Sequence, residues 1–313
     1  MIAFRRIVIV VLENASRDTV LANKYMSDLR KKGVFLSNSH GVTHPSQPNY
    51  FAMTGGDTLG MVSDDPGWVQ WDTVVFSDPV PPVNCIADLL DKKGLSWKAY
   101  AECLTPGDMI YATDPLPEPP DGDFPFARRH VPFLSYPHIM QNKQYANLHI
   151  VNAAENFELD LAAGRLPHYS FYTPNLINDG HSLPPYNYPP DPLNNCNETA
   201  DKYAPAHPIE DKDQLLNIEA FLKNFLGDDP VSKFPPETLI VITFDESYGA
   251  EVPYNIYTLL IGDMLEAGTV RHEPYNHYSL LRTIEDNFGL GTLGRNDAAA
   301  TPYWFVNPAT VNR

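Results

Sequence analysis

The stretch that decides the fold is residues 7–12, IVIVVL, a continuous apolar run that ends at Glu13-Asn14. Unbroken β-branched runs of this kind are typical of parallel strands that are buried on both faces. Residues 239–244, LIVITF, form a second such run, which ends at Asp245-Glu246. Ligands of open α/β sheets bind where the strands end, so the two runs predict one site with four oxygen ligands.

The rest of the chain alternates between strand and helix patterns. Strands are expected at 7–12, 97–101, 148–151, 168–172, 239–244 and 256–261, and helices at 25–32, 85–93, 153–163, 214–226 and 278–287. This order predicts an α/β fold with a mostly parallel central sheet and helices on both faces. Because neither a repeat nor a linker interrupts the 313 residues, we expect a single domain over 1–313.

Proline is unevenly distributed. The 30 prolines concentrate between residues 66 and 137 and between 167 and 236. Turn-forming residues there interrupt short apolar stretches, which predicts long Pro-rich loops around the site. Long loops in compact domains are usually functional, so we expect them to form the walls of the site and to select the substrate.

Residues 43–51, THPSQPNYF, place one hydroxyl between two prolines, just before an expected helix. Proline fixes φ, so Ser46 should lie on a rigid turn with the amide groups of the following helical turn facing an incoming anion. That arrangement suits a nucleophile for phosphate. An ordinary Pro-rich turn would leave the same pattern, because Ser and Pro are common turn residues.

The four strand-end residues have alternative interpretations as well. Asp245-Glu246 could be acids at the start of a helix, and Glu13-Asn14 could be a turn. As a ligand set they offer only oxygen atoms, which favours a hard divalent cation such as Mg²⁺, Ca²⁺ or Mn²⁺. A nearby histidine would allow Zn²⁺ or iron to compete.

Five motifs in chain order carry a family resemblance. They are VLEN at 11–14, HPSQPNY at 44–50, PN at 174–175 with DGH at 179–181, TFDE at 243–246, and NHYSLLRTIE at 276–285. The chain resembles the phosphoesterase family that joins acid phosphatases to bacterial-type phospholipases C, within the alkaline phosphatase superfamily. The segment ASRDTV at 15–20 differs from the phospholipase C pattern and is closer to the acid phosphatase branch.

The resemblance implies roles for residues in these motifs. It implies the metal ligands Glu13, Asn14, Asp245 and Glu246, the catalytic residues Ser46, His130, His181 and His277, and the substrate-binding residues His44, Asn49, Asn175 and Asp179. Asn175 stands where two-metal relatives carry an aspartate, which lowers the ligand charge. We therefore expect one tightly bound divalent cation and leave a second metal site open.

The function that follows is a metal-dependent phosphomonoesterase that works through a phosphoserine at Ser46. A phospholipase C or another phosphodiesterase is the alternative within the family. A non-catalytic binding protein that keeps the fold is the alternative from another class, and the presence of Ser46 together with every expected ligand argues against it.

The formal charge of −17 disfavours nucleic acid or an anionic membrane as a partner, so we expect a small-molecule phosphate ester. No apolar segment reaches the length of a membrane span, and the apolar run after Met1 is too short for a signal peptide. The expected location is therefore intracellular, or secreted with the leader removed. Of the three cysteines, Cys85, Cys103 and Cys196, the first two are the preferred pair in a secreted protein.

Overall fold

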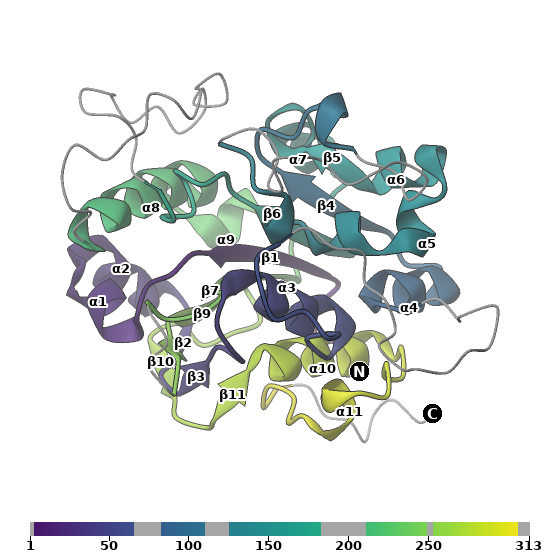
Figure 1. Ribbon diagram of the computed structural model, residues 1–313. Helices are drawn as coiled ribbons and strands as arrows, with labels where there is room; N and C mark the ends of the chain where they lie inside the picture. The colour runs from purple at the N-terminus through teal and green to yellow at the C-terminus, as the bar shows by residue number, and fades with distance from the viewer. Residues whose placement is uncertain (1–2, 66–82, 110–124, 183–210, 249–252, 306–313) are drawn as a thin grey trace.

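The computed structural model of the chain describes residues 3–65, 83–109, 125–182, 211–248 and 253–305. Its main sheet has eight strands in the order β10-β2-β9-β7-β1-β6-β4-β5 (Figure 1). The bounds are β1 (Arg6–Leu12), β2 (Val34–Leu36), β4 (Trp97–Ala101), β5 (Ile150–Asn152), β6 (Tyr169–Thr173), β7 (Thr238–Phe244), β9 (Thr258–Ile261) and β10 (Thr269–Arg271). Only β9 runs antiparallel to its neighbours, so the predicted mostly parallel sheet is confirmed.

β1 lies near the middle of the sheet because its side chains are apolar on both faces. Ile7, Ile9 and Val11 enter one buried cluster. The alternate residues Val8 and Val10 enter the other. β1 pairs in parallel with β6 on one side and with β7 on the other. Each of these pairs joins segments far apart in sequence, so the central part of the sheet depends on distant parts of the chain.

Helices cover both faces, as predicted (Figure 1). The first face is covered by α3 (Ser46–Gly55), η3 (Arg128–His130), η4 (Pro132–Ser135), α4 (Ile86–Lys93), α5 (Pro137–Met140), α6 (Lys143–His149) and α10 (His277–Phe288). The second face is covered by α1 (Arg17–Ala22), α2 (Lys24–Leu29), α7 (Ala153–Ala162) and α8 (Asp211–Leu226). None of the helices within the described ranges is long and apolar enough to cross a membrane.

A small second sheet, in the order β11-β3-β8, lies beside the main one. It consists of β3 (Ser39–His40), β8 (Asn255–Ile256) and β11 (Tyr275–Asn276). β3 leads into the segment that carries Ser46, and β11 leads directly into α10. The small sheet therefore holds the start of α3 and the start of α10 in one neighbourhood.

The expected long elements are present with ends shifted by a few residues. The strand expected at 256–261 is interrupted at Tyr257, which separates β8 from β9. Residues 25–32 form α2 followed by η1 (Arg30–Lys32). Much of the expected Pro-rich loops, at 66–82, 110–124 and 183–210, lies outside the described residues.

The predicted pairing of Cys85 with Cys103 is wrong. Cys85 is a free, buried cysteine, whereas Cys103 is disulfide-bonded. Cys196 lies outside the described residues. Disulfide connectivity cannot be deduced from sequence, and in the structure the thiol of Cys85 is buried where α4 begins, beside Asp88 and His138.

Candidate active site

The candidate site lies at the carboxyl edge of the main sheet, where β1 and β7 end side by side. Because these strands pair with Leu12 opposite Phe244, Glu13-Asn14 and Asp245-Glu246 emerge at the same level. The amide of Asn14 donates to Asp245 Oδ1 at 3.2 Å. Asn14 has φ 47, a left-handed conformation that asparagine adopts more readily than most residues. Asparagine at this position thus fits the sharp turn that brings the two strand ends together.

Ser46 is the first residue of α3 and is 2% exposed. Its hydroxyl donates to Glu13 Oε2 at 2.9 Å, and it lies 3.4 Å from Glu246 Oε1. The expected nucleophile is therefore in direct contact with one carboxylate from each strand end. Its role as nucleophile stays a prediction.

The loop that carries Ser46 is held by the side-chain amide of Asn49. Asn49 Oδ1 accepts the amides of Val42 and Thr43 at 2.8 and 3.1 Å. Asn49 Nδ2 donates to the carbonyls of Thr43 and Pro45 at 2.9 and 3.2 Å. Asn49 was expected to bind substrate, but these four hydrogen bonds direct both ends of its amide to the main chain.

The first turn of α3 offers fewer free amides than the sequence suggested. The amide of Gln47 donates to Asp64 Oδ1 at 2.9 Å, and Pro48 has no N–H. The Gln47 side chain also holds this acidic loop, because it donates to the carbonyls of Ser63 and Asp65 at 2.9 and 2.8 Å. A carboxylate thus already lies at the helix start that we expected to receive an anion.

His44 and His277 both contact the Asp245-Glu246 pair. His44 Nδ1 lies 2.5 Å from Glu246 Oε2, and the His44 side chain is 42% exposed. His277 is buried, and its Nε2 lies 2.5 Å from the Asp245 carbonyl oxygen. A carbonyl only accepts, so Nε2 carries the proton and is used by the main chain. Any contact of His277 with phosphate would have to use Nδ1.

His130 is fully buried between two carboxylates. Its Nε2 lies 3.3 Å from Glu13 Oε1, and its Nδ1 lies 3.2 Å from Asp179 Oδ2. The ring stacks on Tyr50 with centroids 5.1 Å apart, and the Tyr50 hydroxyl donates to Glu13 Oε1. Burial, with Arg129 and His181 nearby, holds the pKa of His130 well below its usual value.

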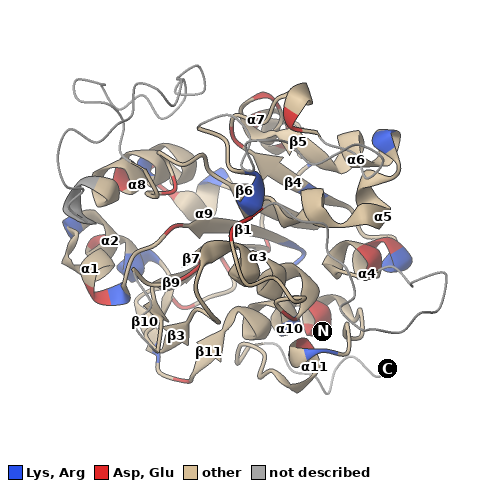
Figure 2. Ribbon diagram, in the orientation of Figure 1, with Lys and Arg blue, Asp and Glu red and all other residues tan. Residues whose placement is uncertain are grey.

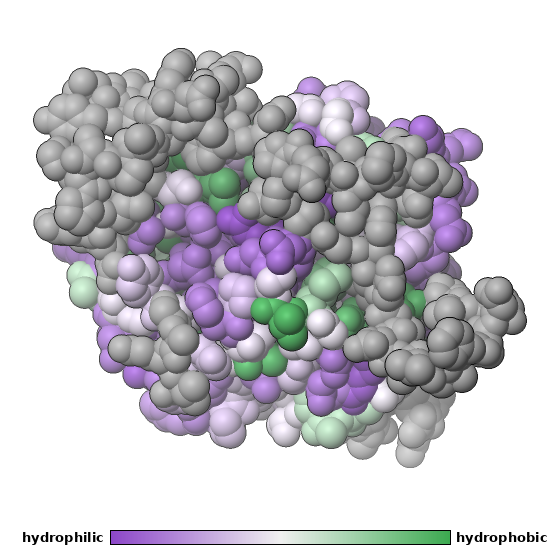
Figure 3. Space-filling model, in the orientation of Figure 1, coloured by the Kyte–Doolittle hydropathy of each residue, from purple (hydrophilic) through white to green (hydrophobic). Residues whose placement is uncertain are grey.

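Arg129 brings a positive charge to this acidic site. Its Nη2 donates to His181 Nε2 at 3.2 Å, which leaves the His181 proton on Nδ1. Burial, and then Arg129, lowers the pKa of His181 to about 4. Arg129 Nε also lies 3.9 Å from Asp64 Oδ2. Figure 2 shows this basic segment near the acidic end of β1, and Figure 3 shows that the middle of the same face is hydrophilic.

Asn175 lies behind the strand ends, in a network around Glu102. Its Oδ1 accepts the amides of Ile177 and Asn178, each at 3.0 Å. Glu102 follows β4, and its Oε2 accepts the Asn175 amide at 3.0 Å and Asn178 Nδ2 at 2.6 Å. These bonds fix the turn that leads to Asp179. Its Oδ1 holds this turn, and the expected role of Asn175 in binding substrate stays a prediction.

The carboxyl groups of the site have raised pKa values. Burial raises the pKa of Asp245 to about 7, and burial together with Asp245 raises that of Glu246 to about 9. Burial also raises the pKa values of Glu13 and Asp179 well above the usual range. Several buried carboxylates close together repel one another, which favours either a bound cation or retained protons.

A divalent cation fits this set of donors. Among the described residues, Oδ2 of Asp245 is a buried oxygen without a hydrogen-bond partner. Glu13, His130 and Asp179 form a group whose ligand atoms all lie within 4.8 Å of one another. This second group differs from the expected one, because His130 and Asp179 had been assigned to catalysis and substrate binding. Glu13 belongs to both, so the two groups are contiguous.

Several site residues were not identified from the sequence. They are Arg129, Tyr50 and Glu102, which contact the expected residues His181, Glu13 and Asn175, and Asp64, which contacts Gln47 in the first turn of α3. Arg129 immediately precedes His130, so the motif that selected the histidine could have selected the arginine as well. Tyr50 closes the motif HPSQPNY and could have been selected in the same way, whereas Asp64 and Glu102 carry no distinguishing sequence signal.

The fold is similar to that of solved structures in the alkaline phosphatase superfamily. A protein of this superfamily from Vibrio parahaemolyticus matches with a TM-score of 0.53 over 97% of this chain and 72% of its own, at 14% sequence identity. At that identity the likeness concerns the fold alone.

The chain belongs to the phosphoesterase family, whose model matches residues 20–189 and 201–291. An acid phosphatase of Aspergillus niger is 33% identical over 316 residues, which cover 99% of this chain and 64% of the relative. A phosphatidylinositol-3-phosphatase of Mycobacterium tuberculosis is 25% identical over 307 residues, which cover 96% of this chain and 83% of the relative. The chain thus spans less than two thirds of the length of the fungal relative. The family resemblance drawn from the five motifs is confirmed.

Proposed function

We propose that this protein is a metal-dependent phosphomonoesterase that forms a phosphoserine at Ser46. One observation carries the proposal: the hydroxyl of a buried serine at the start of α3 contacts carboxylates from two adjacent strand ends. Membership of the phosphoesterase family supports phosphate ester hydrolysis. We also propose that residues 1–313 form one phosphoesterase domain.

The residues of the chain have distinct parts in this reaction. Ser46 donates its proton toward Glu13, which directs the lone pairs of the oxygen away from that carboxylate. As the Ser46 oxygen attacks phosphorus, its proton passes to the Glu13 carboxylate, and the ester oxygen leaves on the opposite side with the Nδ1 proton of neutral His181. Water then attacks the phosphoserine from the side that the ester oxygen vacated, so two in-line steps give net retention.

The cation would be held by Glu13, Asn14, Asp245 and Glu246, with Mg²⁺, Ca²⁺, Mn²⁺ or Zn²⁺ as candidates. When bound, it supplies Lewis acidity, which lowers the pKa of a coordinated hydroxyl and offsets the charge of the transferring group. Arg129 is positioned to offer further donors to the phosphoryl oxygens. The carboxyl groups need that cation to be ionised together, because burial and mutual repulsion otherwise retain their protons.

Ser46→Ala tests the nucleophile. We expect turnover to fall below about a hundredth of wild type, because loss of a covalent nucleophile costs several orders of magnitude. Acid quench of wild type with a labelled substrate should trap phosphate on Ser46. Ser170→Ala is the matched control, since it removes a buried hydroxyl from β6, one without a partner among the described residues. Near-normal turnover in Ser46→Ala would refute the covalent route.

The substrate class is proposed to be a small-molecule phosphate monoester. The fungal relatives are acid phosphatases by name, whereas the mycobacterial relative is named for a phosphorylated lipid. A phospholipase C or another phosphodiesterase remains the second candidate within the family. Release of phosphate from soluble monoesters, without release of choline phosphate from phosphatidylcholine, would exclude it. Release of choline phosphate instead would overturn the choice of a monoesterase.

A further inference from the structure

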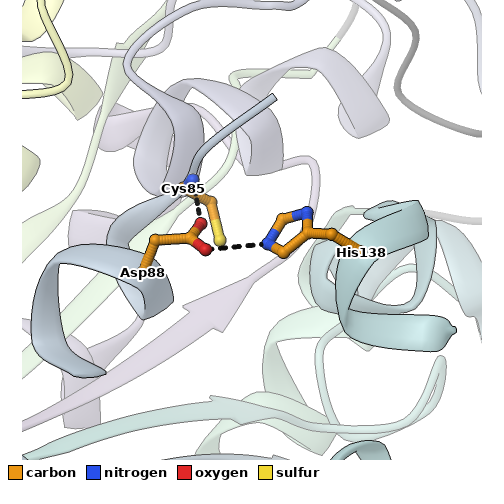
Figure 4. A group of neighbouring side chains, drawn as sticks. All are labelled: Cys85, Asp88 and His138. Atoms are coloured by element: carbon orange, nitrogen blue, oxygen red, sulfur yellow. Dashed lines mark hydrogen bonds and ion pairs between the residues drawn. The ribbon is translucent and has the colours of Figure 1, made fainter. Parts of the chain in front are cut away.

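A second cluster of metal-ligand side chains lies where α4 begins (Figure 4). Cys85 precedes the helix, Asp88 lies in its first turn, and His138 comes from α5. One ligand atom from each of the three lies within 4.8 Å of the other two. The cluster thus combines a thiol, a carboxylate and an imidazole from two helices.

This cluster is separate from the strand-end site. Arg295 Nη1 donates to the carbonyls of Gly55 and Asn84 at 2.6 and 2.9 Å, so the residue before Cys85 lies near the last residue of α3. Ser46 is at the opposite end of α3, a helix of 10 residues. At 1.5 Å per residue that helix is about 15 Å long. None of the three residues has a part in the proposed phosphoryl transfer.

Helix capping accounts for only part of the arrangement. Asp88 Oδ2 accepts the Cys85 amide at 2.8 Å, as expected of an acid in a capping box. Cysteine itself is an unusual residue at this position, where Ser, Thr, Asp or Asn is preferred. His138 Nε2 lies 3.0 Å from Asp88 Oδ1, and both ring nitrogens are buried without an aligned hydrogen-bond partner among the described residues. The Cys85 sulfur completes the capping box by accepting the Asp88 amide, so capping leaves unexplained only the choice of a thiol and the presence of the imidazole.

We propose that Cys85, Asp88 and His138 form a binding site for Zn²⁺ or another borderline transition-metal ion. Sulfur and imidazole nitrogen select such ions over Mg²⁺ or Ca²⁺, which take oxygen ligands. Tetrahedral ligand atoms at about 2.0 to 2.3 Å from one ion lie about 3.3 to 3.8 Å apart, so atoms already within 4.8 Å of one another need only small side-chain rotations. The Asp88 and His138 side chains are 30% and 21% exposed, which leaves an entry path and a fourth position for water.

Binding must displace one proton. Burial, and then the nearby Asp88, raises the pKa of the Cys85 thiol, so the free protein carries S–H. When the metal–sulfur bond forms, the thiol proton passes to solvent, and neutral His138 contributes a lone pair. The backbone amides of Ala87 and Asp88 face the sulfur and stabilise the thiolate that results. A bound ion would link α4 to α5.

Cobalt titration of the metal-stripped protein tests the site through a readout other than activity. Co²⁺ should give a thiolate-to-cobalt charge-transfer band that saturates at one ion per chain and is bleached by Zn²⁺. Cys85→Ser keeps the size of the side chain and should abolish the band. Glu13→Gln, which alters only the strand-end site, should retain it. Absence of the band in wild type, or its persistence in Cys85→Ser, would overturn the proposal.

His138→Gln provides an independent arm if Cys85→Ser folds poorly, because His138 is partly exposed. Partners outside the coordination shell change metal affinity about 10- to 100-fold, so loss of a ligand should weaken Co²⁺ binding more than about 100-fold. His168→Gln is the control, since His168 is bonded to Ser96 instead. Equal affinity of His138→Gln and wild type would remove the histidine from the site and refute the three-ligand assignment.

Discussion

Glu285 and Asp297 form a buried acid pair that should make the protein more stable in acid. Glu285 lies on α10, and its Oε1 accepts the Leu293 amide at 3.2 Å. Its Oε2 is buried and receives no hydrogen bond among the described residues. Burial, and then Asp297, raises the pKa of Glu285 to about 9 from a usual 4.5. At neutral pH the Glu285 carboxyl is therefore protonated and can donate to Asp297.

The sign and size of the effect follow from the raised pKa. The folded state binds a proton that the unfolded state releases, so this contribution is complete below about pH 4.5 and is lost as pH rises toward about 9. Each pH unit within that window changes the free energy of unfolding by about 1.4 kcal/mol. As the pH rises from about 5 to about 8, this one group should lower the free energy of unfolding by about 4 kcal/mol.

Glu285→Gln removes the titration and keeps a donor for Asp297. Urea unfolding at several pH values should give a variant whose stability matches wild type near pH 5 and exceeds it increasingly toward pH 8, with an unchanged slope m. Glu158→Gln is the control, because that side chain is 62% exposed, and it should follow the wild-type curve. If the pH profiles of Glu285→Gln and wild type run parallel, Glu285 is ionised in the folded protein and the reasoning fails.

Three further predictions concern the site. Asp245→Asn and Glu13→Gln should each lose bound metal and activity together, because each removes one ligand charge; full metal occupancy in both variants would place the ion elsewhere. Arg129→Gln should lower kcat/KM about 10- to 150-fold, the worth of a charged hydrogen bond, with Arg129→Lys less affected. A kcat/KM within twofold of wild type would remove Arg129 from the site. His277→Ala should lower kcat and metal affinity, because the hydrogen bond from Nε2 to the Asp245 carbonyl is lost. Metal analysis and single-turnover kinetics measure the two effects. Unchanged metal affinity with lowered kcat would restore the expectation that His277 contacts phosphate.

The strand ends were predictable because their signal is local. β1 and β7 are continuous apolar runs, and the polar residues that follow each run had to lie at the edge of a parallel sheet. A helix close behind Ser46 was also expected, although α3 begins at Ser46 itself and not after a separate turn. Short strands such as β2 and β10 were missed because three residues are too few to establish a period.

What the sequence did not predict depends on contacts across the fold. Asp64 reaches the start of α3 through a hydrogen bond that no local pattern indicates. Asn49 and Asn175 carry amides that suit either substrate or main chain, and only the folded loop shows which groups lie nearby. The state of Cys85 was likewise undetermined, because spacing alone does not fix which thiols approach each other.

The position of β1 also has a consequence for synthesis on the ribosome. β1 pairs with β6 and β7, so its partners are translated only when residues 169–173 and 238–244 emerge. Until then its apolar side chains and both strand edges remain open, a state prone to aggregation. We therefore expect a nascent chain truncated before residue 169 to require a chaperone. A chain truncated between β6 and β7 would pair only one edge of β1. Catalytic competence should therefore arise late in translation, after β7 has emerged.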